Sequence, residues 1–287
     1  MRSDPFLKVR REAENLLEEL GITSLPVDPF KIAEALGISL MPMPSISAGA
    51  SGMLLHVNGQ FGIGYPTHIK NEGFKRFSVS HEIGHYRLPG HVDAVIDADG
   101  QHFSHAGFVT DEKYEKEADH FAAALLMPTG PFFAELRHAG GGLAVIEKLA
   151  GHCDTSLEAT AIRYAQCATE PVAIIRSSGR TIDYAFMSDA LKDFPGLDWI
   201  RKRTPLARDT VTYRFNATME YVRKAARDDG TSLLQDWFGG PHRQEVVEEV
   251  VGLGSYGKTL TVLTGMEPPG EDDDDDLEEA WTPRFRR

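Results

Sequence analysis

The residues best suited to chemistry are His81, Glu82 and His85, which together form the pattern HExxH. On a helix, positions four residues apart lie on the same face, about one turn from each other. Two imidazoles in that arrangement can bind one zinc ion at about 2.0–2.1 Å. Glu82 follows the first histidine and is placed to take a proton from water and return it to a leaving amine. The pattern therefore predicts a zinc site for metal-assisted hydrolysis.

A catalytic zinc site needs a third protein ligand and an open position for water. About thirty residues downstream, residues 115–128 combine carboxylates with a helical apolar stripe: Ala118, Phe121, Ala122, Leu125 and Leu126. Such a stripe can pack against the HExxH helix and bring Glu115 to the metal, so we favour Glu115 as the third ligand. The alternatives are Glu112, Glu117, His91 and His120.

Asp119 lies four residues after Glu115 and shares its helix face. A histidine that binds a metal usually donates its other N–H group to a carboxylate or a carbonyl. We therefore expect Asp119 to accept a hydrogen bond from the ring nitrogen of His81 or His85 that does not bind the metal. For stabilising an oxyanion, the sequence offers Tyr86, Tyr114, His91 and His120 without choosing among them.

The elements that must position these residues can be read from hydrophobic periodicity and turn residues. Helices are expected over 5–21, 29–37, 72–86, 111–126, 131–138, 142–151 and 155–167. Asn58-Gly59 predicts a hairpin within 48–65, which could offer an edge strand to an extended substrate. Residues 89–110 are expected to form a long loop with a short strand at 91–97, and its histidines His91, His102 and His105 to be solvated.

A change in composition begins at Glu170-Pro171. The segments on either side of Gly179 predict a hairpin, and residues 245–265 predict two strands joined at 254–257. Between them, a helix is expected with Asn216 as its N-cap. The second half of the chain is therefore expected to be α+β.

Three stretches resemble the ImmA/IrrE family of zinc metallopeptidases: PVDPFKIAEALGI at 26–38, RFSVSHEIGH at 76–85, and residues 115–128. They span much of 5–130. The resemblance implies a gluzincin-like site with His81, His85 and Glu115 as zinc ligands and Glu82 as general base. Position 119, often asparagine in relatives, is aspartate here.

The resemblance also implies an α+β chain that is divided into several domains. We expect a zincin-like metallopeptidase domain over 1–139 and a helical, helix-turn-helix-like segment over 140–170. A C-terminal α+β regulatory or sensor domain is expected over 171–266, which resembles the IrrE branch with its GAF-like last domain. Residues 267–287, EPPGEDDDDDLEEAWTPRFRR, are expected to be a disordered acidic tail.

Similar proteins cleave helix-turn-helix transcriptional repressors and so control stress-response or mobile-element genes, which makes such a repressor the implied protein substrate. Two other functions are considered. One is a non-catalytic, ligand-sensing transcriptional regulator whose zinc site is structural or vestigial. The other is a DNA-binding factor acting through 142–167.

Charge argues against nucleic-acid binding. The chain of 287 residues has a net charge of −13. Residues 270–287 hold eight acids and three bases, a net −5, which leaves −8 for the rest. Phosphate backbones attract positive charge, so direct contact with nucleic acid is disfavoured.

Composition places the chain among globular proteins, with 41% hydrophobic and 25% charged residues. No uncharged apolar run approaches the length of a membrane-spanning helix. The charged N-terminus does not resemble a secretion signal, and two cysteines suit a reducing compartment. We therefore expect a cytoplasmic protein without a membrane partner.

Overall fold

The computed structural model describes residues 5–44, 50–105, 112–136, 141–241 and 243–267, and it is α+β. The chain divides into two compact units, residues 1–163 and 164–287. Within the described ranges, every helix is too short or too polar to cross a membrane. The tail predicted at 267–287 lies outside the described residues, except for its first position.

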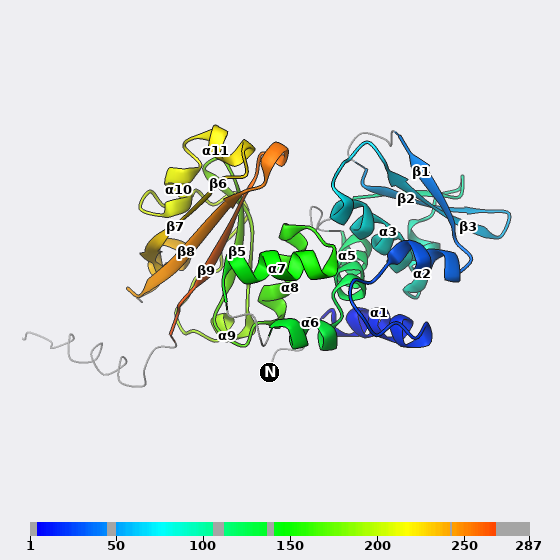
Figure 1. The fold of residues 1–287 in the computed structure, drawn as a ribbon, viewed down its shortest axis with the longest axis horizontal. Coiled ribbons are helices and arrows are strands. Elements are labelled where there is room, and N and C mark those ends of the chain that lie inside the picture. Colours follow the sequence, from blue (N-terminus) through cyan, green and yellow to red (C-terminus); the bar gives the residue numbers. More distant parts are fainter. Residues whose placement is uncertain (1–4, 45–49, 106–111, 137–140, 242, 268–287) are drawn as a thin grey trace, which may run out of the picture. The chain divides into compact units, whose positions relative to one another are not determined.

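The first unit contains a mixed four-stranded sheet in the order β1-β3-β2-β4 (Figure 1). Its strands are β1 (Ser39–Met43), β2 (Gly52–Val57), β3 (Gln60–Pro66) and β4 (Gln101–Ser104). The predicted hairpin is β2–β3, and its turn residues Asn58 and Gly59 both have positive φ, 53° and 76°. The expectation that this hairpin supplies an edge strand is wrong, because β2 pairs with β4 and β3 pairs with β1.

Except for α4, the helices of this unit lie close to the ranges that periodicity predicted. They are α1 (Leu7–Glu19), α2 (Pro29–Ala35), α3 (Glu72–Arg87), α4 (His91–Val95), α5 (Lys113–Leu126), α6 (Thr129–Leu136), α7 (Leu143–Cys153) and α8 (Leu157–Cys167). Helix α8 crosses the boundary between the two units. The strand expected at 91–97 is wrong: His91–Val95 is the helix α4, and the strand of this region is β4.

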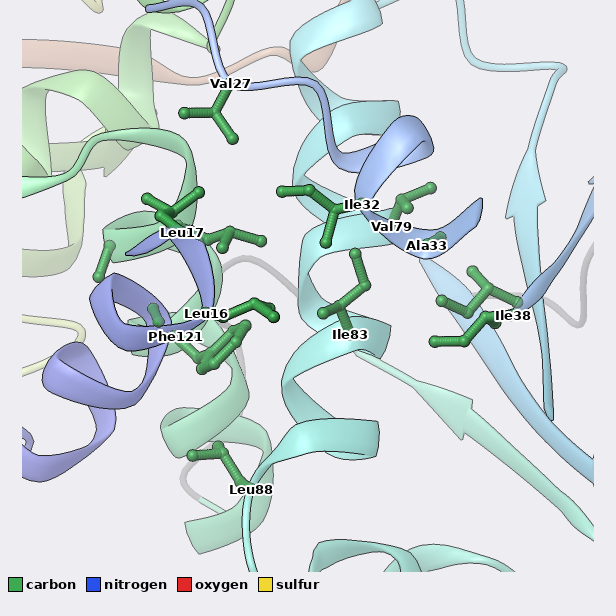
Figure 2. Close-up of a cluster of buried hydrophobic side chains, with 14 of the residues drawn as sticks. Leu16, Leu17, Val27, Ile32, Ala33, Ile38, Val79, Ile83, Leu88 and Phe121 are labelled. Carbon is green, nitrogen blue, oxygen red and sulfur yellow. The ribbon is translucent and has the colours of Figure 1, made fainter. Parts of the chain in front are cut away.

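The core of the first unit forms where α1, α2, α3 and α5 meet the inner face of β2 and β3. Figure 2 shows this cluster, with Ile83 of α3 and Phe121 of α5 pointing into it. Leu54 of β2 and Ile63 of β3 are completely buried in the same cluster. Ile83 stands between the two histidines of the HExxH pattern, so the core fixes the rotation of the helix that carries them.

The second unit contains a five-stranded sheet in the order β6-β5-β9-β8-β7, with every neighbouring pair antiparallel (Figure 1). The strands are β5 (Ala173–Ser178), β6 (Thr181–Met187), β7 (Arg227–Leu233), β8 (Glu245–Gly252) and β9 (Thr259–Thr264). The helices are α9 (Asp189–Lys192), α10 (Val211–Phe215), α11 (Met219–Arg223) and α12 (Leu234–Phe238), and a 3-10 turn, η1 (Gly254–Tyr256), joins β8 to β9. The predicted hairpin at Gly179 and the predicted pair at 245–265 are both confirmed.

Asn216 is not an N-cap, contrary to the prediction. It follows the last residue of α10 as the C-cap, and α11 starts only at Met219. Its side chain donates to Ser177 Oγ at 2.9 Å and to the carbonyl of Gly179 at 2.6 Å. These long-range bonds, which a local pattern does not contain, explain the error.

The start of α3 packs closely on the turn between α7 and α8. A Cβ atom at Gly73 would lie 2.5 Å from the backbone nitrogen of Ser156 and 2.7 Å from the carbonyl carbon of Thr155. Because backbone atoms cannot move aside without shifting a helix, only glycine fits at this position.

We expect Gly73→Ala to lower the free energy of unfolding by about 1–3 kcal/mol, through overpacking. The matched control is Gly151→Ala in α7, where a Cβ atom would meet nothing within 4 Å. That change should be neutral or raise stability by up to about 1 kcal/mol, because alanine favours helices. Urea denaturation of both variants measures the difference. Equal stability of the two would contradict the close approach.

Candidate metal centre

Helix α3 places the HExxH residues in the interior. The helix begins with Asn71 as N-cap, whose side-chain oxygen accepts from the backbone N–H of Phe74 at 3.1 Å. His81, Glu82 and His85 are all completely buried. The Nε2 atoms of the two histidines lie 3.0 Å apart, as expected for positions on one helix face.

Helix α5 brings Glu115 to the two histidines. Its carboxylate oxygens lie 3.3 Å from His85 Nε2 and 3.5 Å from His81 Nε2. One ligand atom from each of the three residues falls within 4.8 Å of the others, and within the described residues this is the group able to hold a metal ion. Two imidazole nitrogens and one carboxylate oxygen are ligands that zinc accepts.

Asp119 lies one turn after Glu115 and contacts His81 rather than His85. Its Oδ1 atom is 2.9 Å from His81 Nδ1, and both side chains are completely buried. A carboxylate at Nδ1 keeps the proton on that nitrogen and turns Nε2 toward the ligand group. Asp119 can therefore orient His81 for metal binding.

The alternative third ligands lie elsewhere. The carboxylate of Glu112 accepts from the backbone N–H of Glu115 at 3.1 Å and so begins α5. Glu117 contacts His91, with 3.0 Å between Oε2 and Nε2. His120 stacks on Phe6 with ring centroids 3.8 Å apart.

The histidines predicted to lie solvated in the loop have contacts with the candidate metal ligands. His91 is 1% exposed, and its Nδ1 atom lies 3.2 Å from His85 Nδ1. His102 is on β4, with Nε2 2.9 Å from Glu115 Oε1, and the backbone N–H of His105 donates to Glu115 Oε2 at 2.8 Å. The expectation of solvated side chains is therefore wrong for His91 and His102. A four-residue strand carries too little periodicity to reveal the position of His102, which follows from its pairing with β2.

The side chains considered for oxyanion stabilisation have other contacts. Tyr86 packs edge-on against Phe61, and Tyr114 packs edge-on against His91. His102 is the polar side chain that approaches the ligand group from the sheet, with 16% of its side chain exposed.

Glu82 has the environment expected of a proton acceptor. Both of its carboxylate oxygens are buried without a hydrogen-bond partner among the described residues. Burial raises the pKa of Glu82 to about 7, although His81 and the Ser104 hydroxyl oppose the rise. A Cβ atom at Gly52 would collide with Glu82 Oε1, so the backbone of β2 lies directly against this carboxylate. A buried carboxylate that lacks a hydrogen-bond partner among the described residues suits a site where water and a metal ion supply its partners.

The charges of the ligand group also suit a cation. Burial alone lowers the pKa of His81, but hydrogen bonds with Asp119 and Glu115 outweigh burial and raise it to about 10. Burial raises the pKa of Glu115, yet its close contacts with His102, His81 and His85 hold the pKa well below its usual range. Burial lowers the pKa of His85 to about 3 and also lowers that of His91. The carboxylates of Asp119 and Glu115 therefore stabilise a positive charge at His81. A divalent cation bound by the ligand residues would be stabilised by the same carboxylates.

Comparison with known proteins finds a family model that matches part of the chain and a solved structure with a similar fold. Residues 33–164 match the Peptidase M78 family model, described as the IrrE N-terminal-like domain. No curated protein matches the chain. Among solved structures, a Mycobacterium tuberculosis transcriptional regulator is similar over 90% of this chain and 87% of its own, with a TM-score of 0.58 and 13% identity. At that identity the likeness concerns the fold alone.

His120 gives a prediction for stability against pH. Burial lowers its pKa to about 3, and the positive charges of Arg10, Arg163 and Lys116 act in the same direction. Between pH 6.5 and about 3, the unfolded chain binds a proton here that the folded chain does not, so the fold loses stability as pH falls through this window.

We expect the free energy of unfolding of His120→Gln to fall less steeply than that of the wild type as pH drops below 6.5. The difference in slope should be up to about 1.4 kcal/mol per pH unit. Urea denaturation of the wild type and the variant at pH 7, 6 and 5 tests this. Parallel pH profiles would show that His120 titrates alike in the folded and unfolded chains.

Proposed function

We propose that the protein is a zinc-dependent metalloendopeptidase, because its residues 33–164 match the IrrE N-terminal-like domain of the Peptidase M78 family model. The observation that carries the proposal is the convergence of His81, His85 and Glu115 beside the buried Glu82, whose carboxylate has no hydrogen-bond partner within the described ranges. Zinc bound by these three residues would activate water and polarise the scissile carbonyl.

The chain's own residues have defined parts in this proposal. His81, His85 and Glu115 hold the metal, and Asp119 orients His81 through its Nδ1 atom. Glu82 accepts the proton of the attacking water on its carboxylate and delivers it to the leaving amine. Its pKa, raised to about 7, suits both steps near neutral pH, because a base that is too weak or too strong would fail at one of them.

The substrate we propose is a protein, most specifically a helix-turn-helix transcriptional repressor whose cleavage would switch on stress-response or mobile-element genes. The family match supports this substrate class, and the similar solved structure is itself named a transcriptional regulator. The chain has two cysteines, Cys153 and Cys167, and both are buried; so few cysteines suit the proposed cytoplasmic location.

Helix α8 is a poor surface for DNA. Residues 159–163 of this helix are buried. Its basic residue Arg163 is 2% exposed and donates to the carbonyl of Met127 and to Thr129 Oγ1, each at 3.0 Å. A side chain engaged in this way cannot reach a phosphate, so the helical segment proposed at 140–170 is better explained by packing.

We propose that residues 171–266 form a regulatory or sensor domain, GAF-like in fold. Its antiparallel five-stranded sheet, with α9 to α12 contributing to two apolar clusters on it, supports this proposal. The preceding part, proposed as a peptidase domain over 1–139, contains all five residues given a role in the site: His81, Glu82, His85, Glu115 and Asp119.

The competing function is a non-catalytic, ligand-sensing regulator whose zinc site is structural or vestigial. The contact between His102 Nε2 and Glu115 Oε1 is the observation that favours it, because a fourth protein ligand would close the site to water. His102 is, however, outside the group of ligand atoms that lie within 4.8 Å of one another. A structural site would also have no use for the buried carboxylate of Glu82.

Glu82→Gln separates these two functions. The variant should bind about one zinc ion per chain, as the wild type does, because the three ligands are untouched. It should lose cleavage of a co-expressed repressor substrate by a factor of about 10² or more, because the base is gone. Metal analysis and gel detection of products measure the two effects. Undiminished cleavage by this variant would refute Glu82 as the base, and absence of zinc from the wild type would refute the metal site.

Gly52→Ala tests the contact between β2 and the base. The added methyl group would displace Glu82 Oε1 while leaving the ligands in place, so cleavage should fall about tenfold or more with zinc content unchanged. Gly130→Ala is the control, since a Cβ atom there meets nothing within 4 Å. Equal cleavage rates for the Gly52→Ala variant and the wild type would count against the contact.

A further inference from the structure

We propose that His91 and Glu117 form a positioning pair for His85, holding this ligand in the tautomer that presents Nε2 to the metal. The inference rests on the proposed metal site and adds two residues to it. The sequence does not predict this role for either residue: both are alternative third ligands there, and His91 is also a candidate for oxyanion stabilisation in an expected loop.

The geometry is a continuous line of hydrogen-bonding contacts. His85 Nδ1 lies 3.2 Å from His91 Nδ1, and His91 Nε2 lies 3.0 Å from Glu117 Oε2. His91, the first residue of α4, is 1% exposed, whereas the side chain of Glu117 on α5 is 23% exposed. The line therefore runs from the buried ligand through a buried imidazole to a carboxylate at the surface.

When both imidazoles are neutral, the protons along this line have one arrangement. The carboxylate of Glu117 can only accept, so His91 donates from Nε2. A neutral His91 then has a bare Nδ1 atom, which must accept from His85 Nδ1–H. A neutral His85 that carries its proton on Nδ1 has a free lone pair on Nε2, the atom that lies nearest His81 and Glu115.

His91 itself is badly placed to be a ligand for the same ion. It meets His85 at Nδ1, on the side of the ring away from the Nε2 atom that faces the ligand group. Its other nitrogen is engaged by Glu117, and Tyr114 packs edge-on against its ring at 5.0 Å between centroids. Its position thus suits support of a ligand.

The two ligand histidines are then supported in different ways. His81 is held directly by Asp119, a completely buried carboxylate. His85 is held through an intervening imidazole by Glu117, which also lies 3.8 Å from Lys113 Nζ. Partners of this kind commonly change metal affinity by about 10–100-fold when they are removed.

The experiment measures zinc affinity of the full-length chain at pH 7 by competition with a chromophoric chelator. His91→Phe keeps a ring of similar size without nitrogen atoms and should weaken zinc binding by about 10–100-fold. Glu117→Ala should weaken it in the same direction, and Glu117→Gln, which still accepts from His91, should lie closer to the wild type. The matched control is Glu135→Ala, which removes an exposed glutamate 3.0 Å from His152 in a pair distant in sequence from the ligands.

A second measurement does not require zinc. Nitrogen-15 NMR of the histidine rings in the metal-free chain should show the proton of His85 on Nδ1 in the wild type and its loss from Nδ1 in His91→Phe. Packing alone would not move this signal. Because Glu117 is partly exposed, its variants also provide a test if His91→Phe does not fold.

The proposed positioning pair would be refuted if both His91→Phe and Glu117→Ala bound zinc as tightly as the wild type. It would also be refuted if the wild type carried the proton of His85 on Nε2. A wild-type chain that shows the expected tautomer but binds no zinc would uphold the pair while refuting the proposed peptidase, so the two failures are distinguishable.

Discussion

The packing of α5 against α3 is the constraint on which the candidate site depends. Glu115 and Asp119 share one face of α5, four residues apart, and that face must point at His81 and His85. A rotation of α5 by one residue, about 100°, would turn both carboxylates away. Phe121, fully buried in the core, prevents such a rotation, because it lies in the same cluster as Ile83 of α3. The apolar cluster therefore sets the geometry of the polar site.

Placing so much charge in this interior is costly unless each group finds a partner. Most of the buried polar groups around the ligands have one: Asp119 meets His81, Glu115 meets His102, and Glu117 meets His91. Glu82 is the exception, because neither of its carboxylate oxygens has a hydrogen-bond partner in the part of the chain that the structure describes. An unsatisfied buried carboxylate lowers the stability of a fold, and proteins tend to tolerate such groups where they serve a function.

The second unit offers a contrast, because it also buries an acid completely. Glu248 of β8 accepts from the backbone N–H groups of Val211 and Thr212 and from the Thr212 hydroxyl, at 2.6–3.1 Å. The Thr212 hydroxyl in turn lies 2.7 Å from that of Thr261 on β9. Glu248 thus joins α10 to the sheet, and its bonds account for its burial without any ligand. Two equally buried glutamates in one chain therefore point to different roles, and the difference is visible only in what surrounds them.

Local patterns were sufficient for the longer helices of the first unit, the turn at Asn58-Gly59 and the HExxH face, because each depends on residues within about one turn or one hairpin. The pairing of Glu115 with the histidines was also within reach, since an apolar stripe shows which side of a helix faces inward. The positions of His91 and His102 could not be inferred in this way, and neither could the bonds of Asn216. Their partners are distant in sequence or belong to elements of four or five residues, too short for any periodic signal. Hydrogen bonds between such segments form only after the apolar core has set their distance and orientation, and for that reason the tertiary structure alone decided which polar groups surround the metal ligands.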